Sequence, residues 1–174
     1  SHVARSRDGF DGRGSRIACQ GAGTTTMADL FALTYLSRAT RDLLPEELDS
    51  ILLQARLFNA AEQITGVLLY GDERFFQLLE GPEASVRKVF DRISGARAHK
   101  DIRVLSQGSI AGRFFDSWHM GFTHSPISAM QDLSQFAWEE AMPCTRGEAE
   151  KSVGLGLVMQ YWETWSADAN GSAS

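Results

Sequence analysis

Alternating stretches of apolar and polar residues predict an α+β domain. The runs at residues 30–37, 64–70 and 74–80 are apolar or aromatic and contain few breaking residues, as is typical of buried strands. Elsewhere, apolar residues recur at positions i, i+3, i+4 and i+7, which predicts helices that begin at Pro45 and directly after Pro82. Each helix therefore has one apolar stripe that must pack against a sheet.

Two weaker strands complete the predicted domain. Residues 102–105 and 118–122 are short apolar runs, and a polar stretch that contains glycine joins them. The predicted order is βαββαββ, with a βαβ crossover at each end of the pattern. We therefore expect a ferredoxin-like α+β fold, in which a mixed sheet carries two helices on one face.

The C-terminal part, residues 125–174, is predicted to be helical. Ser128 with Gln131, and Thr145 with Glu148, both have the spacing of a helix capping box. An aromatic stripe follows at helical spacing, formed by Leu157, Val158, Tyr161, Trp162 and Trp165. The sequence leaves open whether this stripe docks onto the open face of the sheet or forms a dimer or partner surface.

The domain organisation follows from composition. Residues 1–26 are rich in Gly, Ser, Thr and Arg and show no periodicity, so we expect a disordered N-terminal arm, a tag or a linker. The folded domain is expected over residues 27–124. The helical extension at residues 125–174 is then expected to serve output or oligomerisation.

Charge and composition exclude several functions. The net charge of -5, from 17 basic and 22 acidic residues, predicts neither a nucleic-acid nor a membrane-surface partner. No apolar run reaches the roughly 18 residues of a membrane span. Cys19 and Cys144 are far apart and lack metal-ligand spacing, so we expect a cytoplasmic protein with no metal site and no disulfide framework. Paired carboxylates and nucleophile motifs are missing from the sequence, so an enzyme is not expected.

Three polar residues stand where the pattern demands apolar ones. Asn59 falls on the core stripe of the first predicted helix, Gln77 lies within an apolar strand, and Tyr35 lies in the first strand. A buried amide without a partner costs about 1–3 kcal/mol, so each amide must meet a polar group. Singly, each residue could satisfy a nearby backbone group. Together they could line a pocket for a flat heteroaromatic ring.

Over residues 30–122 the sequence resembles the BLUF domains, the sensors of blue light using FAD. The matching stretches are LFALTYLS with Tyr35, AxxxNA around Asn59, ITGVLLY, FFQLLEG with Gln77, and RFFDSWHMGF with Trp118 and Met120. All five residues fall in the order and at the spacing of the family. The resemblance therefore covers the whole predicted domain.

The resemblance implies that FAD, with FMN as the alternative, binds between the two helices beside Ile51, Asn59 and Gln77. It implies that Tyr35 gives an electron and a proton to the excited flavin, after which the Gln77 amide rearranges. A new hydrogen bond to the flavin then shifts its absorption slightly to the red. A phenol and a rotatable amide suit these roles chemically. Trp118 and Met120 would be alternatives for the position next to the glutamine, on one face of the last strand, and would relay the signal outward.

Some positions depart from the family pattern. Ala98 stands where many relatives have an arginine that contacts the flavin, so Arg97 or Lys100 is a candidate to replace that contact. Ala55 stands where a serine is often found, and Phe58 precedes the asparagine. These differences bear on flavin affinity and spectral detail.

The sequence thus predicts a blue-light photoreceptor that is not itself an enzyme and that signals through its last strand and C-terminal helices. Its downstream protein partner is unidentified, and a homo-oligomer is expected. Two other classes stay open, because a fold alone does not fix a function. One is a flavin-dependent oxidoreductase or an acylphosphatase-like hydrolase on the same scaffold, and the other is a light-inert protein-interaction domain.

Overall fold

The computed structural model describes residues 29–116 and 118–171 of the chain. Within them, five strands form one mixed sheet in the order β4-β1-β3-β2-β5. The antiparallel pairs are β1·β3, β1·β4 and β2·β3, and β5 runs parallel to β2. The strands are β1 (Leu30–Ala39), β2 (Thr65–Gly71), β3 (Arg74–Pro82), β4 (His99–Ile110) and β5 (Gly121–His124). The predicted ferredoxin-like α+β fold is confirmed. The N-terminal arm predicted at residues 1–26 lies outside the described residues.

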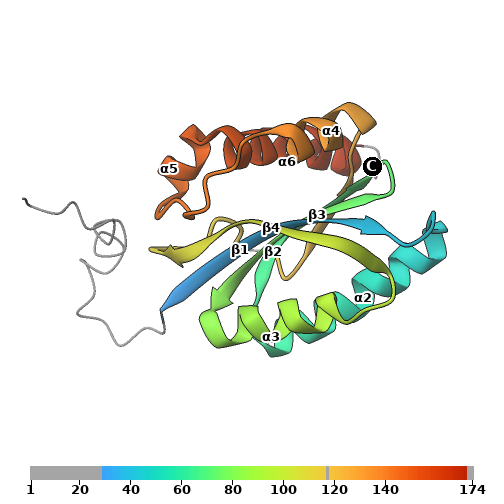
Figure 1. Cartoon of the computed structure of the whole chain (residues 1–174), viewed down its shortest axis with the longest axis horizontal. Helices are drawn as coiled ribbons and strands as arrows, with labels where there is room; N and C mark the ends of the chain where they lie inside the picture. The colour runs from blue at the N-terminus through green and yellow to red at the C-terminus, as the bar shows by residue number, and fades with distance from the viewer. Residues whose placement is uncertain (1–28, 117, 172–174) are drawn as a thin grey trace, which may run out of the picture.

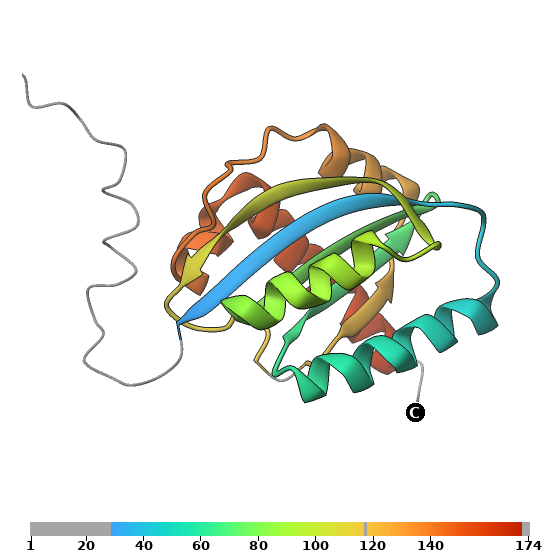
Figure 2. The same ribbon diagram turned by 60° about the horizontal axis from the view of Figure 1, so that its bottom comes forward.

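Helices cover both faces of the sheet. One face carries α2 (Pro45–Ala61) and α3 (Glu83–Ser94), which run roughly along the strands (Figures 1 and 2). The opposite face is covered by α4 (Ile127–Gln135), α5 (Arg146–Lys151) and α6 (Val153–Gly171) (Figure 1). The C-terminal helices therefore dock onto the sheet of their own chain, which answers the question that the sequence left open.

Each face of the sheet has its own apolar core, because side chains alternate between the two faces of a strand. Tyr35, Leu68 and Phe75 face α2 and α3 in one cluster of buried residues. Phe76 and Leu78 belong to the other cluster, which also contains the following residues of α6: Leu155, Val158, Met159 and Trp162. The central strands are buried on both sides, which explains their continuous apolar sequence.

Two predicted elements differ in extent. β4 covers twelve residues instead of four, because it is an edge strand whose polar side chains reach solvent and hide it from an apolar pattern. β5 begins at Gly121, so the prediction of a strand from residue 118 is wrong. Residues 118–120 instead belong to an irregular connection that contacts α2 and β2.

The predicted helix caps have different outcomes. At α5, Thr145 and Glu148 form the predicted capping box. At α4, the N-cap residue is Pro126 and no side chain caps the helix, so the prediction for Ser128 and Gln131 is wrong. The helix begins one residue before Ser128, which moves that side chain out of the capping position.

Cys144 is disulfide-bonded, whereas the sequence predicted no disulfide framework.

No helix in the described part of the chain is both long and apolar enough to cross a lipid bilayer.

Candidate functional site

The centre of the site is a hydrogen-bonded pair on the two middle strands. Tyr35 on β1 lies directly opposite Gln77 on β3, so both side chains point to the same face of the sheet. The Tyr35 hydroxyl donates a hydrogen bond to Oε1 of Gln77. Tyr35 is completely buried and Gln77 is 4% exposed. Tyr35 and Gln77, which the sequence singled out as polar residues in apolar strands, therefore form a hydrogen bond with each other.

Met120 extends this pair to a third residue. Nε2 of Gln77 donates to the Met120 sulfur at 3.2 Å, and Met120 is buried. A thioether is a weak acceptor, and a primary amide has two N–H groups to donate. In the part of the chain that the structure describes, the Gln77 amide nitrogen has no stronger acceptor than this sulfur. Gln77 therefore retains donor capacity that a carbonyl oxygen would satisfy better.

Helix α2 holds the segment that carries Met120. Nδ2 of the buried Asn59 donates to the backbone oxygen of His119 at 3.1 Å. One turn earlier, Nε of Arg56 donates to the backbone oxygen of Met120 at 3.0 Å. Nδ1 of His119 also lies 3.1 Å from the Ile64 carbonyl oxygen. Asn59 is thus a neighbour of the Gln77–Met120 contact through the backbone of this segment.

Trp118 and Met120 do not share one strand face, contrary to prediction. Met120 is 1% exposed and faces Gln77, whereas Trp118 is 45% exposed and packs edge-on against Trp162 of α6, with ring centroids 5.8 Å apart. The cause is the backbone before β5, where the Trp118 oxygen accepts from the Gly66 N–H at 2.9 Å. This bond holds residue 118 off the strand, so the period-two pattern does not apply to it.

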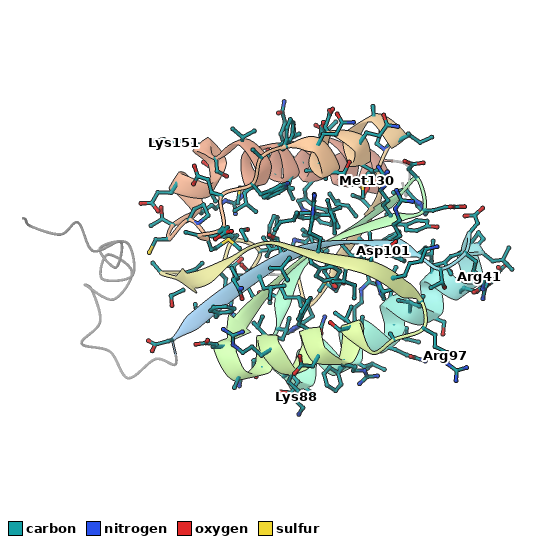
Figure 3. The ribbon with its side chains drawn as sticks, viewed as in Figure 1. Arg41, Lys88, Arg97, Asp101, Met130 and Lys151 are labelled. Carbon is teal, nitrogen blue, oxygen red and sulfur yellow. The ribbon has the colours of Figure 1, made fainter. Side chains whose placement is uncertain are left out.

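The remaining predicted contacts lie further out. Ile51 is half-buried on α2. Arg97 and Lys100 are exposed, and Figure 3 shows Arg97 at the periphery of the molecule. The backbone oxygen of Arg97 accepts from the Thr40 hydroxyl at 3.0 Å, which ties this turn to the end of β1. The structure thus brings together Tyr35, Gln77, Asn59 and Met120, and leaves Arg97 and Lys100 in solvent.

Basic side chains gather where α2 and α3 meet. The Arg92 guanidinium lies 4.2 Å from the centre of the Phe58 ring, and the Lys88 amine lies 5.8 Å from it. Lys88 also pairs with Glu62 at 2.5 Å and so links the two helices. Arg92 is exposed, and its cation–π contact leaves its N–H groups able to bind an anion.

The electrostatics keep the site neutral. Burial raises the pKa of the Tyr35 phenol well above its ordinary value, so the phenol stays protonated as a hydrogen-bond donor. The His99 ring stands edge-on to the Tyr35 ring at 6.3 Å, and burial lowers its pKa to about 4. His99 is therefore uncharged near pH 7, with Nδ1 2.8 Å from the Ser37 hydroxyl. His99 is not marked by any sequence pattern, because it lies in a polar edge strand.

The His99 pKa predicts a pH-dependent stability. Its pKa is lower in the folded chain than the ordinary value of 6.5, so the unfolded chain binds more protons as the pH falls from about 6.5 to about 4. Between pH 7 and pH 5 this group should cost about 2 kcal/mol of unfolding free energy. Urea unfolding of the wild type and of His99→Asn at both pH values measures the cost. The variant should lose less stability on acidification, and equal losses would contradict the assignment.

Comparison with known proteins places this site in a family. The model of the BLUF family, described as sensors of blue-light using FAD, matches residues 30–121. The chain belongs to the BLUF family. The match spans β1 to the first residue of β5, and it includes Tyr35, Asn59, Gln77 and Met120.

BLUF proteins of known sequence and structure resemble the chain over the same domain. The photoactivated adenylate cyclase subunit beta of Euglena longa is 32% identical over 104 residues, which are 59% of this chain and 12% of that protein. The chain thus spans about an eighth of that relative. The photo-activated state of BlsA gives a TM-score of 0.55 at 32% identity, covering 60% of this chain and 76% of that one. The dark-state structure of BlrB, a BLUF protein, gives 0.54 at 32% identity, covering 56% and 74%.

The residues at the centre of the site fit the flavin that BLUF domains bind. Tyr35, Gln77 and Asn59 are uncharged hydrogen-bonding groups, as the neutral edge of an isoalloxazine ring requires. The unused donor capacity of Gln77 suits a ring carbonyl oxygen. Exposed Arg92 would offer positive charge to a phosphate, whereas Lys88 is already paired with Glu62.

Proposed function

We propose that this chain is a blue-light photoreceptor that holds FAD, with FMN as the alternative, between α2 and α3. The observation that carries the proposal is the buried series of hydrogen bonds from Tyr35 through Gln77 to Met120. Gln77, Asn59 and Ile51 would hold the ring. Arg97 and Lys100 are candidates for its polar edge from the sequence, and their exposed side chains would have to turn inward to reach it.

The residues of the chain supply the response to light. When bound, the flavin supplies absorption of blue light and acceptance of an electron. The Tyr35 phenol would donate this electron, and the proton that accompanies it would pass to the flavin through the hydrogen bond to Gln77. The Gln77 amide has a donor and an acceptor on one rotatable group, so it can reverse the pattern that it presents without a backbone movement. This reversal would turn the Gln77 oxygen toward Met120, which then loses its donor.

The signal would leave through Met120 and the strand that follows it. Met120 precedes Gly121, the first residue of β5, and β5 pairs with β2. A Cβ atom on Gly121 would lie 2.5 Å from the ring of Trp162, so this ring of α6 packs directly on the strand. We propose that α6 and the other C-terminal helices pass the change to a separate protein partner, in a homo-oligomer. The proteins that resemble this domain include a photoactivated adenylate cyclase subunit and a light-regulated adenylyl cyclase.

A light-minus-dark absorption spectrum of the purified protein tests the proposal. We expect a flavin spectrum in the dark, a small reversible red shift after blue light, and thermal recovery without any substrate. A protein that stays colourless with excess FAD would contradict flavin binding and favour the interaction domain. Flavin that is bleached only when a reductant or oxidisable substrate is added would favour the oxidoreductase.

Met120 should control recovery more than flavin retention. Met120→Ala removes the acceptor of the Gln77 amide, so the dark-recovery rate should change by on the order of tenfold, equivalent to about 1.4 kcal/mol in the barrier. Trp118→Ala is the matched control, because Trp118 is half exposed and packs against Trp162 of α6. Recovery traces followed after a blue pulse measure both variants. Loss of flavin from Met120→Ala would show a structural role instead.

A further inference from the structure

Glu80 is a buried carboxylate outside the Tyr35–Gln77–Met120 series. It lies three residues after Gln77 on β3, and its side chain therefore points to the opposite face of the sheet. Glu80 is 0% exposed. Burial raises its pKa, and hydrogen bonds from its neighbours oppose that rise. A carboxylate in such a position is destabilising unless its oxygens accept several hydrogen bonds.

The donors to Glu80 come mainly from the connection between β4 and β5. Oε2 accepts from the Phe114 N–H at 2.7 Å, and Oε1 accepts from the Phe115 N–H at 2.7 Å and from the Thr65 hydroxyl at 2.9 Å. Two successive backbone N–H groups thus converge on one carboxylate. Charge-assisted bonds of this kind are shorter and stronger than neutral ones. The Glu80 side chain therefore fastens the start of the β4–β5 connection to β3 through these hydrogen bonds.

Arg113 strengthens the same fastening. Its guanidinium donates to the Thr65 hydroxyl oxygen at 2.9 Å, to the backbone oxygen of Glu80 at 3.1 Å and to that of Gln63 at 2.8 Å. Arg113 thus bridges the end of β3 and the start of β2. Its charge also lowers the cost of burying the carboxylate, although burial remains the larger influence on the Glu80 pKa.

The fastened segment leads directly to Met120. The Phe115 oxygen accepts from the Trp118 N–H at 3.2 Å, and the Trp118 oxygen accepts from the Gly66 N–H at 2.9 Å. The Trp118–Gly66 bond at one end, and the Arg113 bonds to Thr65 and Gln63 at the other, join this segment to residues 63–66. The backbone oxygen of His119 is then held by Asn59, and Met120 follows against Gln77. Among the described residues between Glu80 and Met120, the backbone is thus held by hydrogen bonds at Phe114, Phe115, Trp118 and His119.

We propose that Glu80 is the positioning residue that sets the place of Met120 against Gln77, by fastening the start of the β4–β5 connection to the end of β3. Its effect on photochemistry rests on the function proposed above, whereas its effect on structure does not. Glu80 acts through the backbone of residues 113–119 and touches neither Gln77 nor Met120. Glu80→Gln preserves the volume but turns an amide donor toward a backbone N–H, so one fastening bond is lost and two donors face each other.

The experiment compares Glu80→Gln with Glu83→Gln in the full chain with flavin bound. Glu83 is an exposed residue of α3 that pairs with Arg87, so it controls for loss of one acidic charge. In the dark, amide hydrogen exchange over residues 113–120 should be at least about tenfold faster in Glu80→Gln and unchanged over β1. The ¹³C-methyl resonance of Met120 should shift or broaden only in Glu80→Gln. The dark-recovery rate should change at least about fivefold in this variant.

A double-mutant cycle separates positioning from general weakening of the fold. If Glu80 acts through Met120, Glu80→Gln should change recovery less than about twofold once Met120→Ala is present. Additive effects, or unchanged exchange and an unchanged Met120 resonance, would overturn the proposal. Should Glu80→Gln fail to fold, Thr65→Val removes one donor to the carboxylate, and the same changes are expected at smaller size. Absence of a red shift in the wild type would reject the photoreceptor function. Hydrogen exchange and the Met120 resonance would still show whether Glu80 positions Met120.

Discussion

Tyr35→Phe should bind flavin as the wild type does and should lose the light-induced red shift. The variant removes one oxygen from a fully buried side chain and preserves its ring, so the packing against Phe90 and His99 is retained. The lost hydroxyl is the donor to Gln77 and the oxidisable group of the proposed photochemistry. The amide would then have neither the electron donor nor the proton that its rearrangement requires. Difference spectra before and after a blue pulse measure the effect.

Tyr70→Phe is the matched control for this experiment. Tyr70 faces α2 from β2 and is also buried, but its hydroxyl interacts with Asp42, at 3.5 Å, and with the Leu43 backbone, on the segment before α2. Tyr70→Phe should therefore keep the red shift. An unchanged red shift in Tyr35→Phe would show that another residue is the donor. A lost red shift in both variants would point to a general effect of removing a hydroxyl from this core.

Trp162→Ala should destabilise the folded chain by about 3–5 kcal/mol, the range for removing a large aromatic side chain from a core. Trp162 is 8% exposed and packs edge-on against Phe115 and Trp118 and directly on Gly121. Its removal leaves a cavity between α6 and the sheet, which the rigid strands cannot fill. Equilibrium unfolding in urea, followed by far-UV circular dichroism, measures the loss.

Trp118→Ala provides the comparison for Trp162, because the same residue type is half exposed there. We expect it to cost roughly 1 kcal/mol, as is usual for a partly exposed side chain. If both tryptophan variants cost the same, α6 would not be packed on the sheet as the structure has it. If Trp162→Ala also slowed or accelerated recovery after a blue pulse, the helix would be coupled to the photochemical centre.

The central part of the fold was predictable because burial on both faces leaves a strong pattern. β1, β2 and β3 lie in the middle of the sheet, and their apolar sequences predict them to within about two residues. β4 was underestimated, since half of an edge strand faces solvent and its polar residues resemble a loop. β5 has four residues, and its start depends on hydrogen bonds to distant segments, which no local pattern records.

The candidate site was predictable to the extent that polar residues interrupt apolar strands. Gln77 and Tyr35 were found in this way, and their contact follows from the strand register. The place of Met120 and Trp118 was not predictable, because an irregular connection, rather than a strand, determines it. Glu80 carried the same signal as Gln77, a polar residue in an apolar run, but it stands beside Gly81 and Pro82, where the sequence suggests a strand end. Because of this position near a turn, the sequence did not indicate that the Glu80 carboxylate is fully buried.

The placement of α4–α6 limits how any effector can read this domain. These helices occupy the face of the sheet behind Gln77, so an incoming protein meets their outer surface first. Access to the strands themselves would require the helical layer to peel away, together with Trp162 and the apolar residues beside it. A small displacement of Gly121 beneath the Trp162 ring would change the affinity of α4–α6 for the sheet. A partner would then compete with α4–α6 of the same chain for this face of the sheet.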